Sequence, residues 1–229
     1  DVDWNDRQDI CNEFRYAEAP KPSCYDEMLE MASLGAKVLH SRCVEIAKKY
    51  GVELLVCSSL NRNSGTMVRE KTKMEKMLIS GVAADKNVAK IRVAGLGNDP
   101  ESTFRLLNLL DRNNLNIDVM IQSLGKDGTK SVSFTVAKPD MLRTIDVLND
   151  NKDLLGIKKL DYDENVAKVS VIGAGVRSHS GVAAKMFGAL ANAGINAEMV
   201  TTSEIRITAL IDEAYADQAM RAIHETFLE

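Results

Sequence analysis

An internal repeat in the later part of the chain constrains its fold more than any other feature of the sequence. The segment VAKIRVAGLG begins at Val88 and recurs in altered form as VAKVSVIGAG from Val166. The segment FRLLNLLDRNNLNIDVM then matches AKMFGALANAGINAEMV, after a loop that is two residues longer in the second copy. A duplicated segment of this length indicates that one structural module is used twice.

Each copy of the repeat has the hydrophobic pattern of strand, helix, strand, strand and helix. In the first copy we expect strands at 88–96, 117–124 and 130–137 and helices at 101–114 and 140–154. In the second copy we expect strands at 166–173, 196–202 and 206–212 and helices at 180–193 and 214–228. This order is typical of the ferredoxin-like βαββαβ module, so the sequence predicts an α+β fold that contains two of them.

The strand count predicts how the two modules are connected. Residues 156–162 supply a fourth strand to the first copy, whereas the second copy ends after its last helix. A strand that belongs to neither copy, at 77–85, precedes the first one. We therefore expect module 1, at 86–163, to be inserted into module 2, which would consist of 77–85 plus 164–229.

The part of the chain before the repeat follows a different pattern. Residues 23–51 have the apolar spacing of two helices, the first capped by Ser23 or Asp26 and the second ended by Gly51. A compact strand is expected at 52–60, and the charge run at 69–76 has no apolar face, which is typical of a linker.

Composition excludes several classes of function. The net charge of −4 and the pI of about 5.5 provide no basic surface for nucleic acid. The four cysteines form no C-x-x-C pair, so we expect no metal site and free thiols, as in a reducing cytoplasm. No run of 18 apolar residues occurs and the first residues are acidic, so we expect no membrane span, no signal peptide and a cytoplasmic protein.

Two corresponding loops are candidates for a carboxylate site. The loops GLGNDPES at 95–102 and GAGVRSHSG at 173–181 each lead from a strand into a helix, where free backbone N–H groups favour an anion. An ordinary strand-to-helix turn capped by Asn98, Ser178 or Ser180 explains each loop equally well. Neither loop is a dinucleotide fingerprint or a Walker loop, and the sequence around His179 has no acid and nucleophile pattern of the kind that general-base catalysis uses, so no catalytic residue is expected.

Polar residues on the predicted strands add candidates for the rest of such a site. Ser203 and Glu204 follow two threonines at a strand end, where hydroxyls and a carboxylate could receive an ammonium group. Asp118 and Gln122 are four residues apart on one predicted strand and so should face the same side.

The sequence resembles the aspartate kinases (aspartokinases) over residues 23–229. CYDEMLEMASLGAKVLHSRCVEIAKKYGVELLVCSSL is similar to the end of their catalytic domain, and GAGVRSHSGVAAKMFGALANAGINAEMVTTSEIRITALI resembles their second ACT module. The strand NIDVMIQ resembles one in their first ACT module. The resemblance implies that residues 1–68 are a C-terminal remnant of an α/β amino-acid-kinase domain and that both repeats are ACT modules.

The resemblance also implies a function. Such a parent enzyme phosphorylates the β-carboxylate of aspartate with ATP and Mg²⁺, and its ACT modules bind lysine, threonine or both for feedback inhibition. These 229 residues contain no Lys-Phe-Gly-Gly-type start and no aspartate-recognition region, so we expect this chain alone to be inactive and to need no cofactor. The alternative is a free-standing ACT-type sensor without a kinase partner, although such a sensor has no reason to carry residues 25–60.

The resemblance further implies two effector sites between modules and a homodimer formed through the ACT modules. The lysine-type site would use acids and a helix start, namely Asp118, His179, Ser180, Gly181, Val182, Ser203 and Glu204. The threonine-type site would use neutral groups, namely Asn98, Gln122, Asn196 and Ala197.

Overall fold

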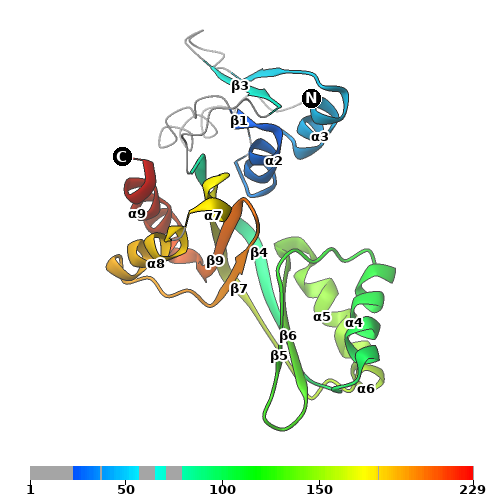
Figure 1. The fold of residues 1–229 in the computed structure, drawn as a ribbon. Helices are drawn as coiled ribbons and strands as arrows, with labels where there is room; N and C mark the ends of the chain where they lie inside the picture. Colours follow the sequence, from blue (N-terminus) through cyan, green and yellow to red (C-terminus); the bar gives the residue numbers. More distant parts are fainter. Residues whose placement is uncertain (1–22, 37, 57–64, 71–78, 180, 229) are drawn as a thin grey trace. The chain divides into compact units, whose positions relative to one another are not determined.

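The computed structural model describes residues 23–36, 38–56, 65–70, 79–179 and 181–228 (Figure 1). The chain divides into two compact units. The first unit comprises the residues up to 85 together with 168–211 and 215–229, and the second comprises 86–167 and 212–214.

The N-terminal part of the first unit is a small α/β layer. It contains β1 (Ser23–Cys24), α2 (Tyr25–Ser33), α3 (Ser41–Tyr50), β2 (Leu54–Val56) and β3 (Thr66–Arg69), with the strands in the order β1-β3-β2. β1 is parallel to β3 and β2 is antiparallel to it. The helices pack on the sheet through a cluster of buried apolar residues, Tyr25, Met28, Val44, Ala47 and Val68.

The ends of these elements correct three expectations. The residue before α2 is Cys24, whose N–H donates to Glu27 Oε2 at 3.3 Å, so neither Ser23 nor Asp26 caps the helix. Gly51 ends α3, as predicted, and the structure shows it in the left-handed conformation. Arg69 belongs to β3, where Thr66 and Val68 alternate inward, so the linker cannot begin at 69, and residues 71–76 lie outside the described part. Of the strand expected at 52–60, only Leu54–Val56 is a strand among the described residues.

Both copies of the repeat contribute to one six-stranded sheet with the order β5-β6-β4-β7-β9-β8. Its strands are β4 (Gly81–Leu96), β5 (Met120–Leu124), β6 (Lys130–Ala137), β7 (Lys159–Ile172), β8 (Met199–Thr202) and β9 (Arg206–Asp212). The long strands β4 and β7 are neighbours: Ser80 N–H donates to Ile172 O at 2.7 Å, and Lys158 N–H donates to Ala94 O at 2.9 Å. The start of β4 therefore lies beside the end of β7, and both of these segments belong to the first unit.

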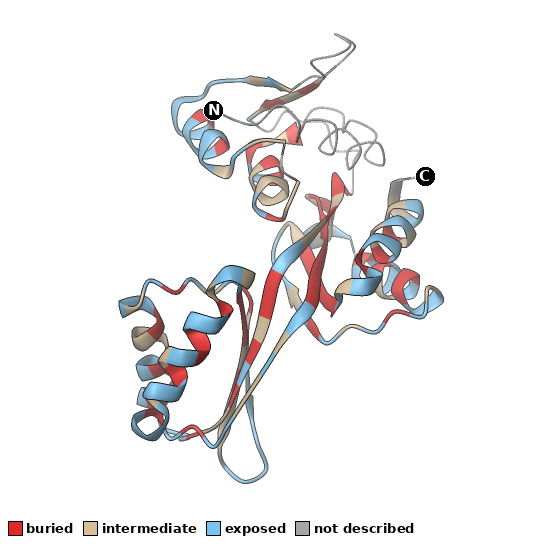
Figure 2. Cartoon of the chain, turned by 180° about the vertical axis from the view of Figure 1, so that it is seen from behind, coloured by how far each residue is buried: buried red, intermediate tan, exposed pale blue. Residues whose placement is uncertain are grey.

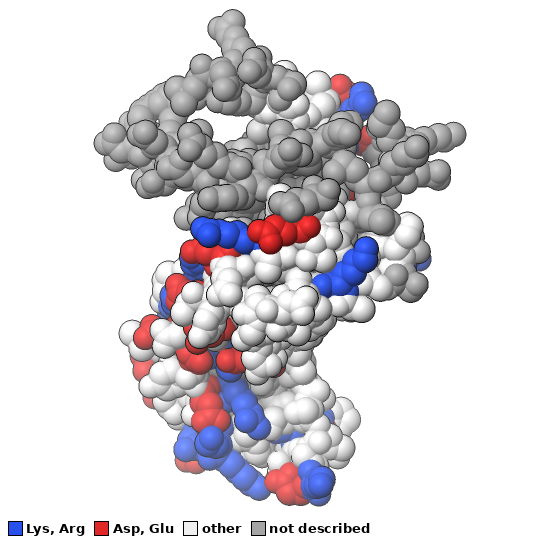
Figure 3. Space-filling model, turned by 90° about the vertical axis from the view of Figure 1, so that its left-hand side faces the viewer, with Lys and Arg blue, Asp and Glu red and all other residues white. Residues whose placement is uncertain are grey.

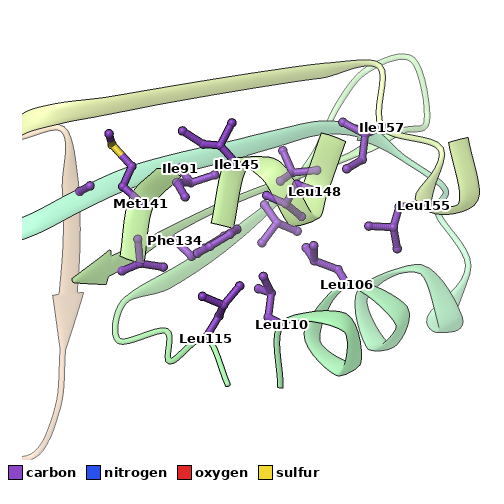
Figure 4. Packing of buried hydrophobic residues seen from close by; sticks show 14 of the residues in the cluster. Ile91, Leu106, Leu110, Leu115, Phe134, Met141, Ile145, Leu148, Leu155 and Ile157 are labelled. Carbon is purple, nitrogen blue, oxygen red and sulfur yellow. The ribbon is translucent and has the colours of Figure 1, made fainter. Parts of the chain in front are cut away.

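Amphipathic helices cover the sheet within each unit. The second unit has α4 (Pro100–Arg112), α5 (Met141–Asp150) and α6 (Lys152–Leu155), and the first has α7 (Gly175–Ser178), α8 (Val182–Asn192) and α9 (Ala216–Leu228). In the second unit Leu106 and Leu110 of α4 meet Ile145 and Leu148 of α5 over Phe134 of β6 (Figure 4). Buried residues are concentrated on the strands and on the inner stripes of the helices (Figure 2). Apolar residues at helical spacing thus explain both cores.

Several predicted elements have different bounds in the structure. The helix expected at 140–154 is divided into η3 (Lys138–Asp140), α5 and α6, because Asn151 ends α5 and bonds back to Val147 O at 2.9 Å. The last helix begins at Ala216 after a 3₁₀ turn, η4 (Glu213–Tyr215). β5 and β8 begin at Met120 and Met199, three residues later than expected, although Asp118 N–H already donates to Thr135 O and Glu198 N–H to Leu210 O ahead of the regular strands.

Candidate functional site

Two loops of the first unit carry most of the predicted lysine-type residues. Gly173 N–H donates to Ile205 O at 2.9 Å, which places the loop before α8 beside the loop between β8 and β9. Ser203 N–H closes the second loop by donating to Arg206 O at 2.7 Å. The structure therefore brings the segment that contains His179 next to the segment that contains Glu204.

The start of α8 is open among the described residues. Gly181 precedes the helix with φ of 101°, a conformation that favours glycine, and no side-chain cap is found there. A Cβ added to Gly181 would meet nothing within 4 Å, and His179 is exposed. Val182 is buried and anchors the first turn in the core. Ser180 lies outside the described residues. The first backbone N–H groups of α8 are thus placed where an anion could approach.

Arg177, which was not among the predicted site residues, links the two loops through an ion pair. Arg177 Nη1 lies 2.9 Å from Glu204 Oε1, and both side chains are more than two thirds exposed, at 71% and 74%. Such an exposed pair is weak, on the order of 0–1 kcal/mol, so a stronger ligand for Glu204 could displace Arg177. In the sequence, only the opposite charges of Arg177 and Glu204 in the two loops could have indicated this contact.

The corresponding helix start in the second unit is closed. Asp99 is the residue before α4, and its Oδ1 accepts from the backbone N–H groups of Glu101 at 3.0 Å and Ser102 at 2.9 Å. The hydrogen bond from the Ser102 hydroxyl, with smaller help from the helix N–H groups, lowers the pKa of Asp99 from its ordinary value. The expectation that Asn98 caps this helix is therefore wrong by one residue, and Asn98 itself is exposed.

Asp118 and Gln122 do not lie on one regular strand face. Asp118 precedes β5, and both Asp118 N–H and Val119 O bond to the backbone of Thr135, which is the pattern of a β-bulge. A bulge interrupts the alternation on which the same-face expectation rested. Gln122 is on β5, and its Oε1 accepts from Thr103 Oγ1 of α4 at 2.7 Å.

The other predicted residues fall into separate units. Asp118, Asn98 and Gln122 belong to the second unit, whereas Asn196 and Ala197 belong to the first, with Asn196 exposed and Ala197 packed against the core. The pairing of Asp118 with Glu204, and of Asn98 and Gln122 with Asn196 and Ala197, therefore remains a prediction.

Helix α2 forms hydrogen bonds with both loops at the start of α8 and between β8 and β9. The sequence did not predict these contacts. Glu27 is buried, and its Oε1 accepts from Ala174 N–H at 3.2 Å at the beginning of the first loop. Glu30 Oε2 accepts from Arg206 Nη1 at 2.9 Å at the end of the second loop.

An apolar contact lies beside these polar ones. Leu34 packs with Ala83 and Ile172, and a Cβ at Gly35 would come within 2.5 Å of Ala84 O. The close approach of Gly35, whose φ is 100°, requires a residue without a side chain.

Other kinds of site are not apparent in the part of the chain that the structure describes. That part contains no group of three or more His, Cys, Asp or Glu residues that could hold a metal ion. None of its helices is both long and apolar enough to cross a membrane. Acidic and basic side chains are interspersed on the face shown in Figure 3 rather than separated by sign.

The fold and the paired loops define an ACT-domain protein, and residues 169–227 match the ACT-domain family. The chain is 42% identical to a chain in a crystal structure of aspartokinase alpha and beta subunits, covering 65% of this chain and 98% of that one with a TM-score of 0.61. It is 33% identical to the regulatory subunit of aspartate kinase from Thermus thermophilus, covering 66% of this chain and 99% of that one with a TM-score of 0.62. The chain belongs to the aspartokinase family and contains its ACT-domain regulatory region.

Longer relatives extend this comparison. The chain is 40% identical over 206 residues to an aspartokinase of Pseudomonas aeruginosa, covering 89% of this chain and 50% of that protein. It thus spans about half the length of the curated relatives that it matches. E. coli aspartokinase III in complex with lysine and aspartate shares the fold, with a TM-score of 0.73 and 24% identity over 94% of this chain and 48% of that one.

Proposed function

We propose that this chain is the allosteric regulatory region of an aspartate kinase and that it binds lysine at the two loops 173–182 and 202–206. The observation that carries the proposal is the start of α8, which no side chain of the described residues caps, in a loop whose Arg177 contacts Glu204. The backbone N–H groups at the helix start suit the carboxylate of an amino acid, and Glu204 with Ser203 suits an ammonium group. The lysine complex of E. coli aspartokinase III is consistent with this choice of effector.

The proposal includes the nested arrangement of two ACT modules. Module 1 at 86–163 would be inserted into module 2, which would consist of 77–85 and 164–229. The bond from Ser80 to Ile172 and the division between residues 85 and 86 and between 167 and 168 support it. Residues 1–68 would be the end of an amino-acid-kinase domain, to which the α/β layer of α2, α3 and β1–β3 corresponds.

Catalysis belongs to the longer parent protein in this proposal. ATP and Mg²⁺ would be bound there, and we assign no step of phosphoryl transfer to residues of this chain. ATP-dependent aspartyl hydroxamate formation by the purified chain would contradict that assignment.

The contacts of α2 favour a regulatory region over a free-standing sensor. Glu27 and Glu30 come from the kinase-like layer and bond to Ala174 and Arg206, which flank the two candidate effector loops. An effector that rearranges these loops would therefore act directly on the kinase-like layer. A free-standing sensor would have no use for this connection.

Calorimetric titration with lysine tests the proposed site. A charge-assisted contact contributes about 1.5–3 kcal/mol, so Glu204→Ala should weaken lysine binding about tenfold to a hundredfold. Asp118→Ala should do the same if Asp118 from another module completes the site, as the resemblance to aspartate kinases implies. Glu225→Ala, which removes an exposed carboxylate of α9 far along the chain from both loops, is the matched control and should leave the affinity unchanged. Affinities within twofold of the parent for both site variants would contradict the lysine assignment, and threonine binding alone would point to the threonine-type site instead.

A further inference from the structure

Helix α2 makes contacts on two opposite faces, although it has only nine residues. Tyr25 and Met28 belong to the buried cluster of the α/β layer, and Leu29 packs against that cluster. The opposite face carries four residues at the spacing i, i+3, i+4 and i+7, namely Glu27, Glu30, Met31 and Leu34, the last of which directly follows the helix. An α-helix has about 3.6 residues per turn, so residues at this spacing form one stripe. We call this stripe the outer face of α2.

The two carboxylates of the outer face meet donors beside the ends of β7 and β9. The two oxygens of the buried Glu27 are divided between partners: Oε2 accepts from Cys24 N–H at the start of α2, whereas Oε1 accepts from Ala174 N–H at 3.2 Å. Glu30 Oε2 accepts from Arg206 Nη1 at 2.9 Å. Burying a carboxylate without such donors is costly, so Glu27 indicates a contact that is built into the fold.

The apolar half of the outer face packs on β4 and β7. Leu34 forms a buried cluster with Ala83 of β4 and Ile172 of β7. Met31 packs at the edge of this cluster, where its sulfur would lie 3.3 Å from a Cβ added to Gly81. Anchors at i, i+3, i+4 and i+7 are the pattern by which a protein surface binds a single helix.

The turn after α2 makes the closest approach to the sheet. A Cβ added to Gly35 would lie 2.5 Å from the backbone oxygen of Ala84, a separation that Cβ atoms essentially never show. Gly51, after α3, also has a positive φ, but a Cβ there would meet nothing within 4 Å. Glycine at position 35 therefore serves the contact as well as the backbone conformation.

The contact has a small apolar cluster of its own. The cluster of Leu34, Ala83 and Ile172 is distinct from the one inside the α/β layer and from the one beneath α8 and α9. The parts on the two sides of the contact therefore have separate cores. Opening a local contact of this kind requires less free energy than unfolding either core.

We propose that α2 is a docking helix, whose outer face binds a site on the sheet and can leave it while both cores stay folded. The site consists of residues in or next to β4, β7 and β9, namely Gly81, Ala83, Ile172, Ala174 and Arg206. It fits a helix with carboxylates at i and i+3, apolar side chains at i+4 and i+7, and a glycine directly afterwards. The inference rests on the proposed function only for the role of the adjacent loops: if they bind an effector, docking of α2 links their occupancy to the α/β layer.

Methyl NOE spectra of the full chain test the docking, with Gly35→Ala as the variant that should open the contact. The added Cβ meets backbone rather than a flexible side chain, so the turn has to move away from β4. Gly51→Ala is the matched control, because it places the same strain of a positive φ after the other helix of the layer without a clash.

The parent and Gly51→Ala should show a cross-peak between the methyl groups of Leu34 and Ile172. Gly35→Ala should lose this cross-peak but keep those within the α/β layer and those within the core beneath α8 and α9. A retained cross-peak between Leu34 and Ile172 in Gly35→Ala would overturn the proposal. Loss of the cross-peaks within either core would overturn it as well, since α2 would then be an integral part of that core.

A second variant tests the polar half without backbone strain. Glu27→Gln combined with Glu30→Gln keeps the size of both side chains and removes both charges, so the cross-peak between Leu34 and Ile172 should weaken and the amide signal of Ala174 should shift. Asp26→Asn, on the exposed side of the same helix, should leave both signals unchanged. Unchanged signals in the double variant would contradict the docking role of the carboxylates. None of these measurements uses lysine, so the docking of α2 and the proposed function can fail independently.

Discussion

At the scale of single residues, the residue before the helix distinguishes the starts of α4 and α8. Asp99 satisfies the first N–H groups of α4, whereas Gly181 leaves those of α8 without a side-chain cap among the described residues. An aspartate before a helix stabilises it both by these hydrogen bonds and by its charge at the positive end of the helix dipole. The same residue therefore stabilises the first turn of α4.

The stability contributed by Asp99 should depend on pH. Hydrogen bonds from the Ser102 hydroxyl and the helix N–H groups lower the pKa of Asp99 in the folded state. A lowered folded pKa means that the contribution is complete above the unfolded pKa of about 3.9 and is lost as the pH falls through the folded value. Urea midpoints measured downward from about pH 5 should thus fall less steeply for Asp99→Asn than for the parent. The control Asp111→Asn, in the last turn of α4, should follow the parent, and coincident curves for Asp99→Asn and the parent would refute the link.

At the scale of elements, α4 shows how one helix combines a buried and an exposed stripe. Leu106 is fully buried in the core that Figure 4 shows, whereas Phe104 on the same helix is 62% exposed. The size of an apolar side chain therefore says little about its contribution to stability, and its position on the helix says much.

Leu106→Ala should destabilise the chain by about 2–5 kcal/mol, because it leaves a cavity between α4 and the sheet. Phe104→Ala removes a larger side chain from the same helix and should change the free energy of unfolding by less than about 0.5 kcal/mol. Urea unfolding followed by circular dichroism measures both. Equal losses for the two variants would mean that Phe104 is buried by a contact that the chain makes in solution.

Helix α2 is the second element whose contacts carry a prediction. Glu30 and Arg206 pair at 2.9 Å with exposures of only 28% and 20%, so their interaction is screened less than that of an exposed pair. A double-mutant cycle with Glu30→Ala and Arg206→Ala should give a coupling energy of about 1 kcal/mol. The matched pair Asp26 and Lys48, which is about half exposed at 55% and 50%, should give a smaller value. A coupling energy of zero for Glu30 and Arg206 would show that α2 is not held at Arg206 in solution.

At the scale of the whole molecule, the outer strands of the six-stranded sheet are β5 and β8. Unpaired strand edges are natural places for another chain to bind. The chain should therefore form a homodimer through its ACT modules, in line with the multi-subunit assembly of the aspartokinase alpha and beta subunits. Light scattering should give twice the 25.1 kDa mass of one chain, and a mass that stays at 25.1 kDa with and without lysine would contradict the dimer.

Local patterns made much of the fold predictable. The repeat and the end of α3 at Gly51 follow from hydrophobic periodicity and glycine, which act over a few residues. The strand count does not, because β4 (Gly81–Leu96) and β7 (Lys159–Ile172) each join two strands that were expected to be separate. Element ends were less predictable, because they depend on where backbone pairing becomes regular, as after Asp118 before β5. The cap of α4 was misplaced by one residue because Asn98 and Asp99 are both good capping residues, and only the direction of the backbone selects between them.

The sequence by itself determined that the chain carries two related modules and that each offers a loop before a helix. Only the tertiary structure decided that Asp99 caps α4 and that Glu204 pairs with Arg177. It also decided which residues form hydrogen bonds with α2. Glu27 and Ala174 are 147 positions apart, and Glu30 and Arg206 are 176 apart, so no local pattern relates them. Such contacts form only when α2, from the layer of β1, β2 and β3, packs against loops of the six-stranded sheet in the same unit, which places distant polar groups within hydrogen-bonding distance.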